Sequence, residues 1–161
     1  LKTGSHASQI WLKTTICQSV MTDPGSRSTD CAQVTVDLAA LGRNYETMRD
    51  KSGMAEAAAV IKADAYGMGM TRIVPKLLAM GCQSFFVALE KEGYAARDLA
   101  PDADIYVLNG LPAGAARDFA EAGLRPCLIS LEQMAEWQDF CRAQGAHPAC
   151  VFVDTGFNRL G

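Results

Sequence analysis

Residues 57–62 read AAAVIK, a run of small and apolar residues that ends in a single charged residue, Lys62. Its length suits one strand, and the lack of apolar and polar alternation is typical of a strand buried on both faces. The segment that follows reads ADAYGMGM and contains Asp64, Tyr66 and two glycines, the composition of a loop. We therefore predict a buried strand that delivers a lysine to a loop at its carboxyl end.

The same pattern, an apolar run closed by one polar residue, recurs along the chain. The closing residues are Asp37, Lys62, Glu90, Asn109, Ser130 and Asp154. They stand 25, 28, 19, 21 and 24 positions apart in the sequence. Because a strand, a loop and a helix together take roughly 20 to 30 residues, this spacing predicts six βα units and a parallel α/β protein.

The segments between these runs have the apolar periodicity of helices. We predict helices within residues 38–50, 72–81, 111–124 and 131–145. Gly81 and Gly123 are expected to end two of them, and Pro112 lies near the start of another. In the last segment, the residues expected to face the core are Leu131, Met134, Trp137, Phe140 and Cys141.

The composition excludes several classes of function. Fifteen Lys and Arg against 18 Asp and Glu give a net charge of -3 without a basic stripe, so we predict no nucleic-acid partner. The apolar runs are of strand length, far below the roughly 18 residues of a membrane helix, so we predict no membrane partner. The six cysteines form no CxxC pair, which favours reduced thiols, no metal site and a cytoplasmic protein.

The beginning of the chain differs in character from the rest. Residues 1–33 are rich in Ser and Thr, contain no contiguous apolar signal segment, and have their first methionine at Met21. We predict a flexible N-terminal extension over 1–33, with Met21 as the natural start, and one α/β domain over 34–161.

Ligands bind at the carboxyl ends of the strands in parallel sheets, so the closing residues mark the expected site. Lys62 brings a positive charge and a potential nucleophile to the end of an apolar strand, where desolvation makes an amine reactive. A lysine followed by a loop with a tyrosine and glycines suits a Schiff base with pyridoxal phosphate (PLP). By itself this signal is weak, because many barrels place a lysine at a strand end.

Two longer motifs make the sequence recognisable. VIKADAYGMG at 60–69 resembles the signature of the PLP-dependent alanine racemases, and VDTGFNRLG at 153–161 resembles that family's second barrel motif. The stretch FFVALEKEGYAARDLAPDADIYVLNG at 85–110 is also similar to family sequence, and the resemblance runs from Val34 to Gly161. It implies the N-terminal part of a (β/α)8 barrel of the TIM type, with about six βα units and without the family's C-terminal β domain.

The resemblance also implies functions for single residues. Lys62 would carry PLP covalently and act as a base at the substrate Cα, Tyr66 would contact the cofactor phosphate, and Arg159 would bind both the cofactor and the substrate carboxylate. The implied activity is the interconversion of L- and D-alanine, which supplies D-alanine for peptidoglycan, by a cytoplasmic homodimer.

In the family, the second base is a tyrosine of the C-terminal β domain of the partner subunit. We therefore expect this chain, as an N-terminal fragment, not to racemise alanine efficiently on its own. The alternatives are a single-domain PLP-binding barrel and a non-functional truncated product.

Three residues depart from the family pattern. Met68 stands where histidine is frequent, and Phe157 replaces a common methionine. Phe152 occupies the position of a lysine that many members carbamylate to orient the arginine. A related racemase of other specificity is therefore a further alternative.

Overall fold

The computed structural model describes residues 34–161, and these divide after Asp37 into the end of a first unit and a second unit, Leu38–Gly161. All the helices and strands described below belong to the second unit. The predicted N-terminal extension and the proposed start at Met21 lie outside the described residues, as do Cys17 and Cys31.

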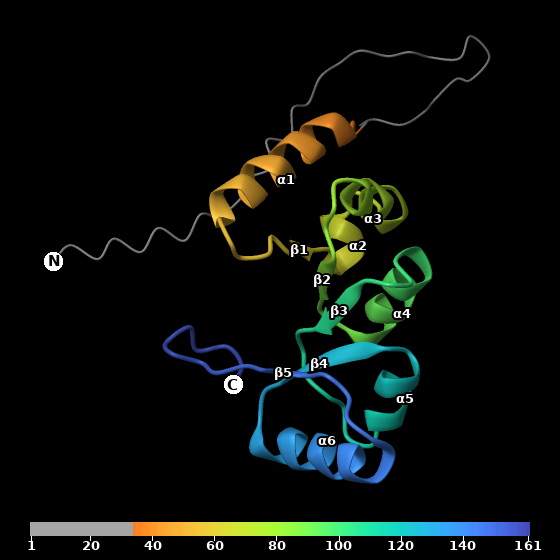
Figure 1. Cartoon of the computed structure of the whole chain (residues 1–161), viewed down its shortest axis with the longest axis vertical. Coiled ribbons are helices and arrows are strands. Elements are labelled where there is room, and N and C mark those ends of the chain that lie inside the picture. Colours follow the sequence, from red (N-terminus) through yellow and green to blue (C-terminus); the bar gives the residue numbers. More distant parts are fainter. Residues whose placement is uncertain (1–33) are drawn as a thin grey trace, which may run out of the picture. The chain divides into compact units, whose positions relative to one another are not determined.

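The centre of the second unit is a parallel sheet whose strands follow one another in chain order, β1-β2-β3-β4-β5 (Figure 1). The strands are β1 (Ala59–Val60), β2 (Ser84–Val87), β3 (Asp104–Val107), β4 (Leu124–Leu128) and β5 (Cys150–Val151). Each pairs in parallel with the next, with Phe85 opposite Ile105 and Cys127 opposite Cys150. Sequential parallel pairing is the arrangement of the strands in a (β/α)8 barrel.

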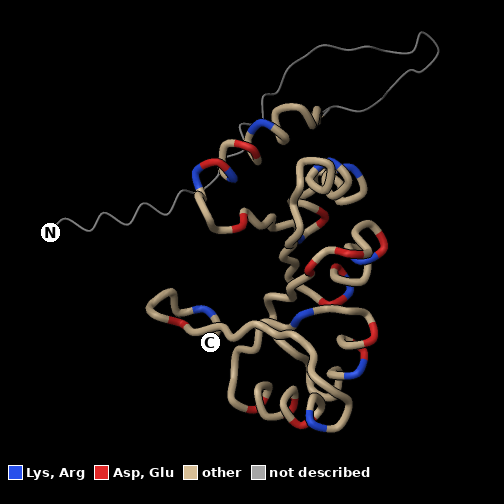
Figure 2. Tube along the Cα trace, in the orientation of Figure 1, with Lys and Arg blue, Asp and Glu red and all other residues tan. Residues whose placement is uncertain are grey.

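One helix precedes β1, and the others connect the strands, as the spacing of the apolar runs predicts. They are α1 (Leu38–Ser52), α2 (Lys62–Tyr66), α3 (Met70–Ala79), α4 (Glu90–Leu99), α5 (Ala116–Glu121) and α6 (Leu131–Gln144). In Figure 1, α3, α4 and α5 lie along the same face of the sheet. Lys and Arg are interspersed with Asp and Glu along these helices (Figure 2). Within residues 34–161, no helix combines the length and the apolar character that crossing a membrane requires.

The core lies between this helical layer and the sheet. Phe85 and Val87 of β2 and Ile105 and Val107 of β3 are fully or almost fully buried on the helix side. At Gly93 of α4 a Cβ atom would stand 2.9 Å from a methyl carbon of Leu124, so only glycine lets α4 pack this closely on the sheet.

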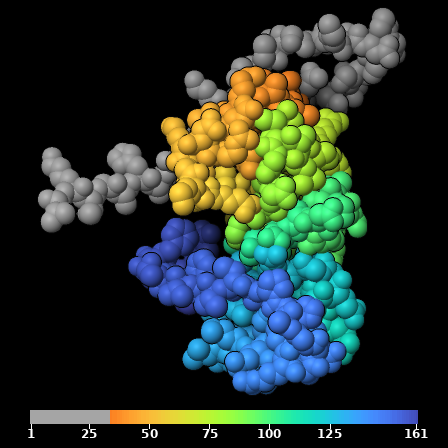
Figure 3. Space-filling view, in the orientation of Figure 1, coloured from red at the N-terminus to blue at the C-terminus, as the bar shows by residue number. Residues whose placement is uncertain are grey.

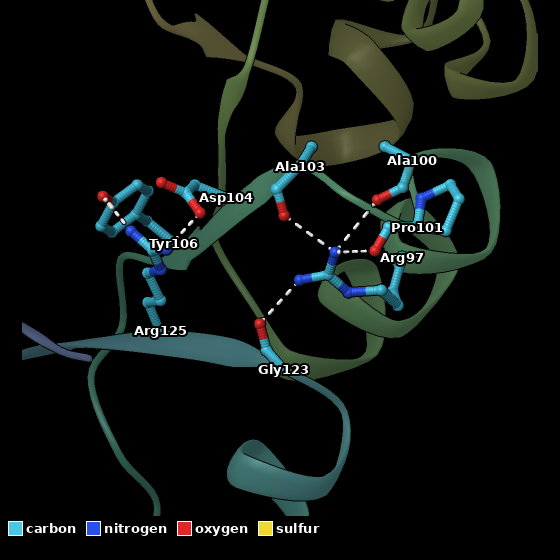
Figure 4. A network of polar contacts seen from close by, with 8 residues as sticks. All are labelled: Arg97, Ala100, Pro101, Ala103, Asp104, Tyr106, Gly123 and Arg125. Carbon is cyan, nitrogen blue, oxygen red and sulfur yellow. Dashed lines mark hydrogen bonds and ion pairs between the residues drawn. The ribbon is translucent and has the colours of Figure 1, made fainter. Parts of the chain in front are cut away.

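The other face of the sheet is less covered. Phe86 and Tyr106 are half-buried there and stack with ring centroids 4.7 Å apart. The Arg125 guanidinium lies over the Tyr106 ring, donates to its hydroxyl at 3.0 Å, and pairs with Asp104 (Figure 4). This face therefore carries an aromatic and ionic layer.

Arg97, near the end of α4, binds the backbone at the amino-terminal side of the sheet. Figure 4 shows its guanidinium directed at carbonyl oxygens of two chain reversals. The acceptors are Ala100, Pro101, Ala103, Ala122 and Gly123, at 2.6 to 3.1 Å. One side chain thus joins the turn after α4 to the turn after α5, far from the carboxyl ends of the strands.

Two sequence predictions about elements are wrong in detail. The described residues contain five strands instead of six, because 34–37 form no strand and β1 is the first strand of the sheet. An apolar run becomes a strand only where a neighbouring backbone pairs with it, and the sequence does not specify that neighbour. In α6, Trp137 is buried as predicted, but Leu131 and Met134 are 78% and 38% exposed. Apolar periodicity marks one face of a helix and does not specify how far along the helix a neighbour covers that face.

Candidate active site

The carboxyl ends of the five strands meet at one edge of the sheet, because all the strands are parallel. Lys62 follows β1, Glu90 and Asn109 follow β2 and β3, Ser130 follows β4, and Asp154 follows β5. Asp37 directly precedes α1 and does not end a strand, so it does not belong to this set. Ser130 accepts a hydrogen bond from the Gln133 N–H at 3.3 Å and caps α6.

The chain leaves β1 in an unusual conformation. Ile61 still donates its N–H to the Phe86 carbonyl oxygen at 2.8 Å, and then four consecutive residues, Ala63 to Tyr66, have φ between 52° and 57°. Ala65 donates to the Ile61 carbonyl at 2.8 Å and Gly67 to the Ala63 carbonyl at 2.9 Å, so α2 is a turn of left-handed helix. Each L-residue in this conformation costs about 1 kcal/mol or more, and such strain concentrates at functional sites.

Two carboxylate side chains, one from α4 and one from the turn itself, hold the turn in place. Glu92 of α4 accepts from the Ala63 N–H at 2.8 Å, and Asp64 accepts from the Met70 N–H, the first residue of α3, at 2.6 Å. Ala65 is almost fully buried and fixes the inner side of the turn. The strained turn is therefore anchored to α3, to α4 and to the core.

The pKa of Glu92 reflects these contacts. Burial acts to raise the pKa, but the N–H groups of Ala63, Leu89 and Ala88 and the charge of Lys62 outweigh burial, and the pKa falls below its ordinary value. Glu92 is therefore an ionised acceptor at neutral pH.

Lys62 and Tyr66 stand at the two ends of the turn. The Lys62 side chain is half-buried, the Tyr66 side chain is 58% exposed, and the lysine Nζ lies 5.9 Å from the centroid of the tyrosine ring. Gly67 and Gly69 have φ of 79° and 90°, and no atom lies within 4 Å of where their Cβ atoms would be. An amine, a phenol and open space beside the backbone are thus brought together.

The segment after β5 is organised by Asp154. Its carboxylate accepts from the N–H groups of Gly156, Phe157 and Arg159 at 2.7 to 2.8 Å, and these backbone bonds lower the pKa of Asp154 to about 2. Asn158 adopts φ of 55° within this loop. Asp154 therefore shapes the loop that carries Arg159.

Arg159 itself does not reach the lysine in this structure. Its guanidinium carbon lies 4.6 Å from the centroid of the Phe157 ring, and no contact within residues 34–161 joins it to Lys62 or Tyr66. β1 and β5 are the two edges of the sheet, and Figure 3 shows the last residues (dark blue) projecting from the body of the unit. The structure thus brings two of the three predicted site residues together.

Sequence reasoning missed Glu92 and the left-handed turn. Glu92 is the third residue of α4, the position from which a glutamate reaches back to the start of a helix, so this part of its function was accessible from the sequence. Nothing in the letters ADAY signals left-handed residues, since three of the four have side chains that disfavour this conformation.

The geometry defines a class of protein: a parallel α/β sheet with a primary amine at a strand end and a phenol beside it can hold a small cofactor that carries an aldehyde and an anionic group. In the part of the chain that the structure describes, no group of three or more His, Cys, Asp and Glu is placed to bind a metal ion.

Comparison with known proteins identifies the family. The model of the alanine racemase N-terminal domain matches residues 36–161, and the chain belongs to this family. It is 50% identical over 131 residues to an alanine racemase of Methylobacterium sp. strain 4-46, a match covering 81% of this chain and 36% of the relative.

Solved structures agree with this family. The crystal structure of alanine racemase from Bartonella henselae with covalently bound pyridoxal phosphate has a TM-score of 0.75 and 37% identity, over 78% of this chain and 37% of that one. A histidine racemase from Leuconostoc mesenteroides has a TM-score of 0.70 and 26% identity, over 77% and 34%. The predicted family and barrel fold are confirmed, and the chain spans about a third of the length of the curated relatives it matches.

Proposed function

We propose that the protein is a PLP-dependent alanine racemase and that Lys62 is the residue that carries the cofactor. One observation carries this proposal: in a member of the alanine racemase family, a lysine at the end of β1 stands beside Tyr66 on a strained left-handed turn. Strain of this kind persists only where the surrounding structure enforces it, which Asp64 and Glu92 do here.

The residues fit the cofactor. Lys62 supplies the primary amine that PLP requires, and its half-buried position limits hydration of that amine. The Tyr66 hydroxyl is exposed and free to donate to a phosphate, and Gly67 and Gly69 leave open space next to the backbone. The Arg159 guanidinium presents planar paired donors that suit a carboxylate or a phenolic oxygen.

Bound PLP withdraws electrons from the substrate Cα and so makes its proton acidic. Lys62 would hold the cofactor through Nζ, and its amine, when free, would accept the substrate Cα proton on one face. Arg159 would bind the substrate carboxylate and so fix which face of Cα Lys62 meets. Return of a proton to the opposite face inverts the configuration, so racemisation needs a second base in addition to Lys62.

The test begins with the cofactor. PLP added to the protein should produce a visible absorbance band, and borohydride reduction followed by peptide mapping should find the cofactor on Lys62. Lys62→Arg should abolish both signals, whereas Lys91→Arg, an exposed lysine on α4, should leave them intact. Folded wild-type protein that forms no reducible adduct, or forms it elsewhere, would refute the proposal.

The substrate is tested by Cα exchange. With L-alanine in D2O, we expect deuterium to be incorporated at Cα, and this incorporation should depend on Lys62. D-alanine should form only when the second base is also present. Exchange that persists in Lys62→Arg would show that another residue removes the proton.

A racemase of another amino acid is the second candidate. It is supported by the structural similarity to the histidine racemase and by Phe152, which has no amine to carbamylate at the position implied by the resemblance. Phe152 contacts the end of the loop that carries Arg159, because a Cβ atom at Gly161 would stand 2.5 Å from its ring. A panel of L-amino acids in the Cα exchange assay distinguishes the two: faster exchange with a larger substrate than with alanine favours this candidate.

We also propose a cytoplasmic homodimer that supplies D-alanine for peptidoglycan. The similarity to alanine racemases supports the product, and free Cys82, Cys127, Cys141 and Cys150 suit a reducing compartment. Sedimentation equilibrium tests the dimer, and a D-alanine auxotroph tests the supply by complementation.

A further inference from the structure

The carboxylate of Glu92 binds two loops at once. One oxygen, Oε1, accepts from the Ala63 N–H at 2.8 Å, and the other, Oε2, accepts from the N–H groups of Ala88 and Leu89 at 2.8 and 3.1 Å. Ala63 is the residue directly after Lys62, whereas Ala88 and Leu89 precede α4. One side chain thus fixes the start of the lysine turn relative to the neighbouring βα loop.

The bonds from the Ala88 and Leu89 N–H groups to Glu92 are those of an ordinary helix cap. Within residues 34–161, the start of α6 has a similar cap without a bond from a second loop. Gln133 is the third residue of α6, as Glu92 is the third residue of α4, and its Oε1 accepts from the Ile129 N–H at 3.0 Å. The bond from Ala63 to Glu92 goes beyond a cap, because it comes from a different βα unit.

The lysine turn needs an anchor of this kind. Its four residues from Ala63 to Tyr66 are all in the left-handed region, which is unfavourable for the two alanines and the tyrosine. A right-handed or extended alternative would redirect the Lys62 and Tyr66 side chains relative to each other. A charged acceptor at Ala63 favours the observed conformation, because hydrogen bonds to ionised groups are stronger than those between neutral groups.

We propose that Glu92 is a positioning residue for the lysine site: through the Ala63 N–H it holds the left-handed turn that keeps the Lys62 amine beside Tyr66. The importance of Glu92 for catalysis rests on the proposed function. The effect of Glu92 on the conformation of the turn does not, because it is expected in protein without cofactor as well. Glu92 does not touch Nζ, so its effect is on the conformation of the turn.

The first measurement is amide hydrogen exchange of residues 61–70 in protein without cofactor. Glu92→Ala should raise exchange in this segment about tenfold or more, and Gln133→Ala, the matched loss of a cap in α6, should leave it unchanged. If Glu92→Ala raises exchange only at the start of α4, Glu92 is a helix cap and the proposal is wrong.

The second measurement is PLP binding followed by absorbance. Glu92→Ala should weaken PLP binding about tenfold while borohydride still traps the cofactor on Lys62, and Glu92→Gln, which keeps one acceptor oxygen, should lie between it and wild type. Should Glu92→Ala not fold, as judged by circular dichroism, Glu92→Gln carries both measurements. If a folded Glu92 variant shows faster amide exchange in residues 61–70 but binds PLP as tightly as wild type, the proposal that Glu92 positions the lysine site is wrong.

The two proposals fail in different ways. If wild-type protein attaches no PLP at Lys62, the proposed function is wrong, while the exchange measurement still decides whether Glu92 holds the turn. If wild type attaches PLP and neither Glu92 variant changes exchange or affinity, only the inference about Glu92 is wrong.

Discussion

The Nζ atom of Lys62 lies 5.9 Å from the centroid of the Tyr66 ring, and the two residues are four positions apart in the chain. A left-handed helical turn has the same number of residues per turn as its right-handed mirror image, so residues four apart share one side of it. The amine and the phenol therefore meet because of the turn, and the Tyr66 ring is a direct neighbour of the proposed cofactor site.

Tyr66→Phe should keep the ring and remove the hydroxyl. If that hydroxyl donates to the cofactor phosphate, a charge-assisted hydrogen bond of about 1.5 to 3 kcal/mol is lost, and the Kd for PLP should rise about 10- to 100-fold. The absorbance maximum should stay in place because Lys62 is unchanged. Tyr94→Phe, a change at a partly exposed tyrosine on α4, serves as the control, and equal Kd values for Tyr66→Phe and wild type would contradict the phosphate contact.

Ala63→Gly should stabilise the protein, which is unusual for an alanine-to-glycine change. Ala63 is exposed and has φ of 52°, a conformation that glycine adopts without a Cβ penalty. The relief of about 1 kcal/mol is partly offset by the greater freedom of glycine in the unfolded chain, leaving about 0.5 kcal/mol.

The control for this change is Ala95→Gly at an exposed position within α4, which should cost about 1 kcal/mol. Urea unfolding measures both, and the two midpoints should move in opposite directions from wild type. A loss of stability in Ala63→Gly equal to that in Ala95→Gly would show that the turn is not strained at Ala63.

Most of the fold was predictable from periodicity. The strands that end before Lys62, Glu90, Asn109, Ser130 and Asp154 are confirmed, because a buried parallel strand is a continuous apolar run with a polar residue where it emerges. The run before Asp37 shows the same pattern but pairs with no strand of the sheet. Pairing depends on tertiary structure, which the pattern of one run does not specify.

The candidate site was predictable only in part. The motif located Lys62 and Tyr66 in one segment together with the glycines at 67 and 69, which have positive φ in the structure. The left-handed residues at 63–66 were not predictable, since they depend on acceptors that α4 and the turn itself provide. Arg159 and Lys62 stand at opposite edges of the sheet, so their proposed cooperation depends on closure of the barrel.

Arg97 should be important for stability and unimportant for the site. Arg97→Ala leaves five backbone carbonyls, among them those of Ala103 and Gly123, without their donor, which should cost about 2 to 3 kcal/mol. Arg97→Lys should recover little, because an ammonium group cannot match the planar fork of a guanidinium.

The matched control is Arg142→Ala, which removes an exposed guanidinium paired with Asp139 and should cost less than about 0.5 kcal/mol. Thermal unfolding compares the variants, and PLP binding should be the same in each folded protein. A small Tm change for Arg97→Ala, similar to that of Arg142→Ala, would mean that water replaces the lost donors.

Acid should disorder the loop that carries Arg159 at an unusually low pH. Three backbone N–H groups lower the pKa of Asp154 to about 2, below the ordinary value near 3.8. A carboxyl group whose pKa is depressed by folding stabilises the folded loop fully above its ordinary pKa and loses this contribution as the pH falls through the lower value. The loop should therefore stay ordered at pH 4 and lose its bonds as the pH approaches about 2.

The amide resonances of Gly156 and Phe157 report this transition, and their pH midpoint should lie near 2 while the helical circular dichroism persists. Asp154→Asn should remove the transition and make residues 154–161 several times more sensitive to protease at neutral pH, because a neutral amide is a weaker acceptor for three N–H groups. Asp139→Asn, which changes the charge equally on exposed α6, should do neither. A wild-type midpoint near pH 4 would mean that Asp154 does not hold the loop through its charge.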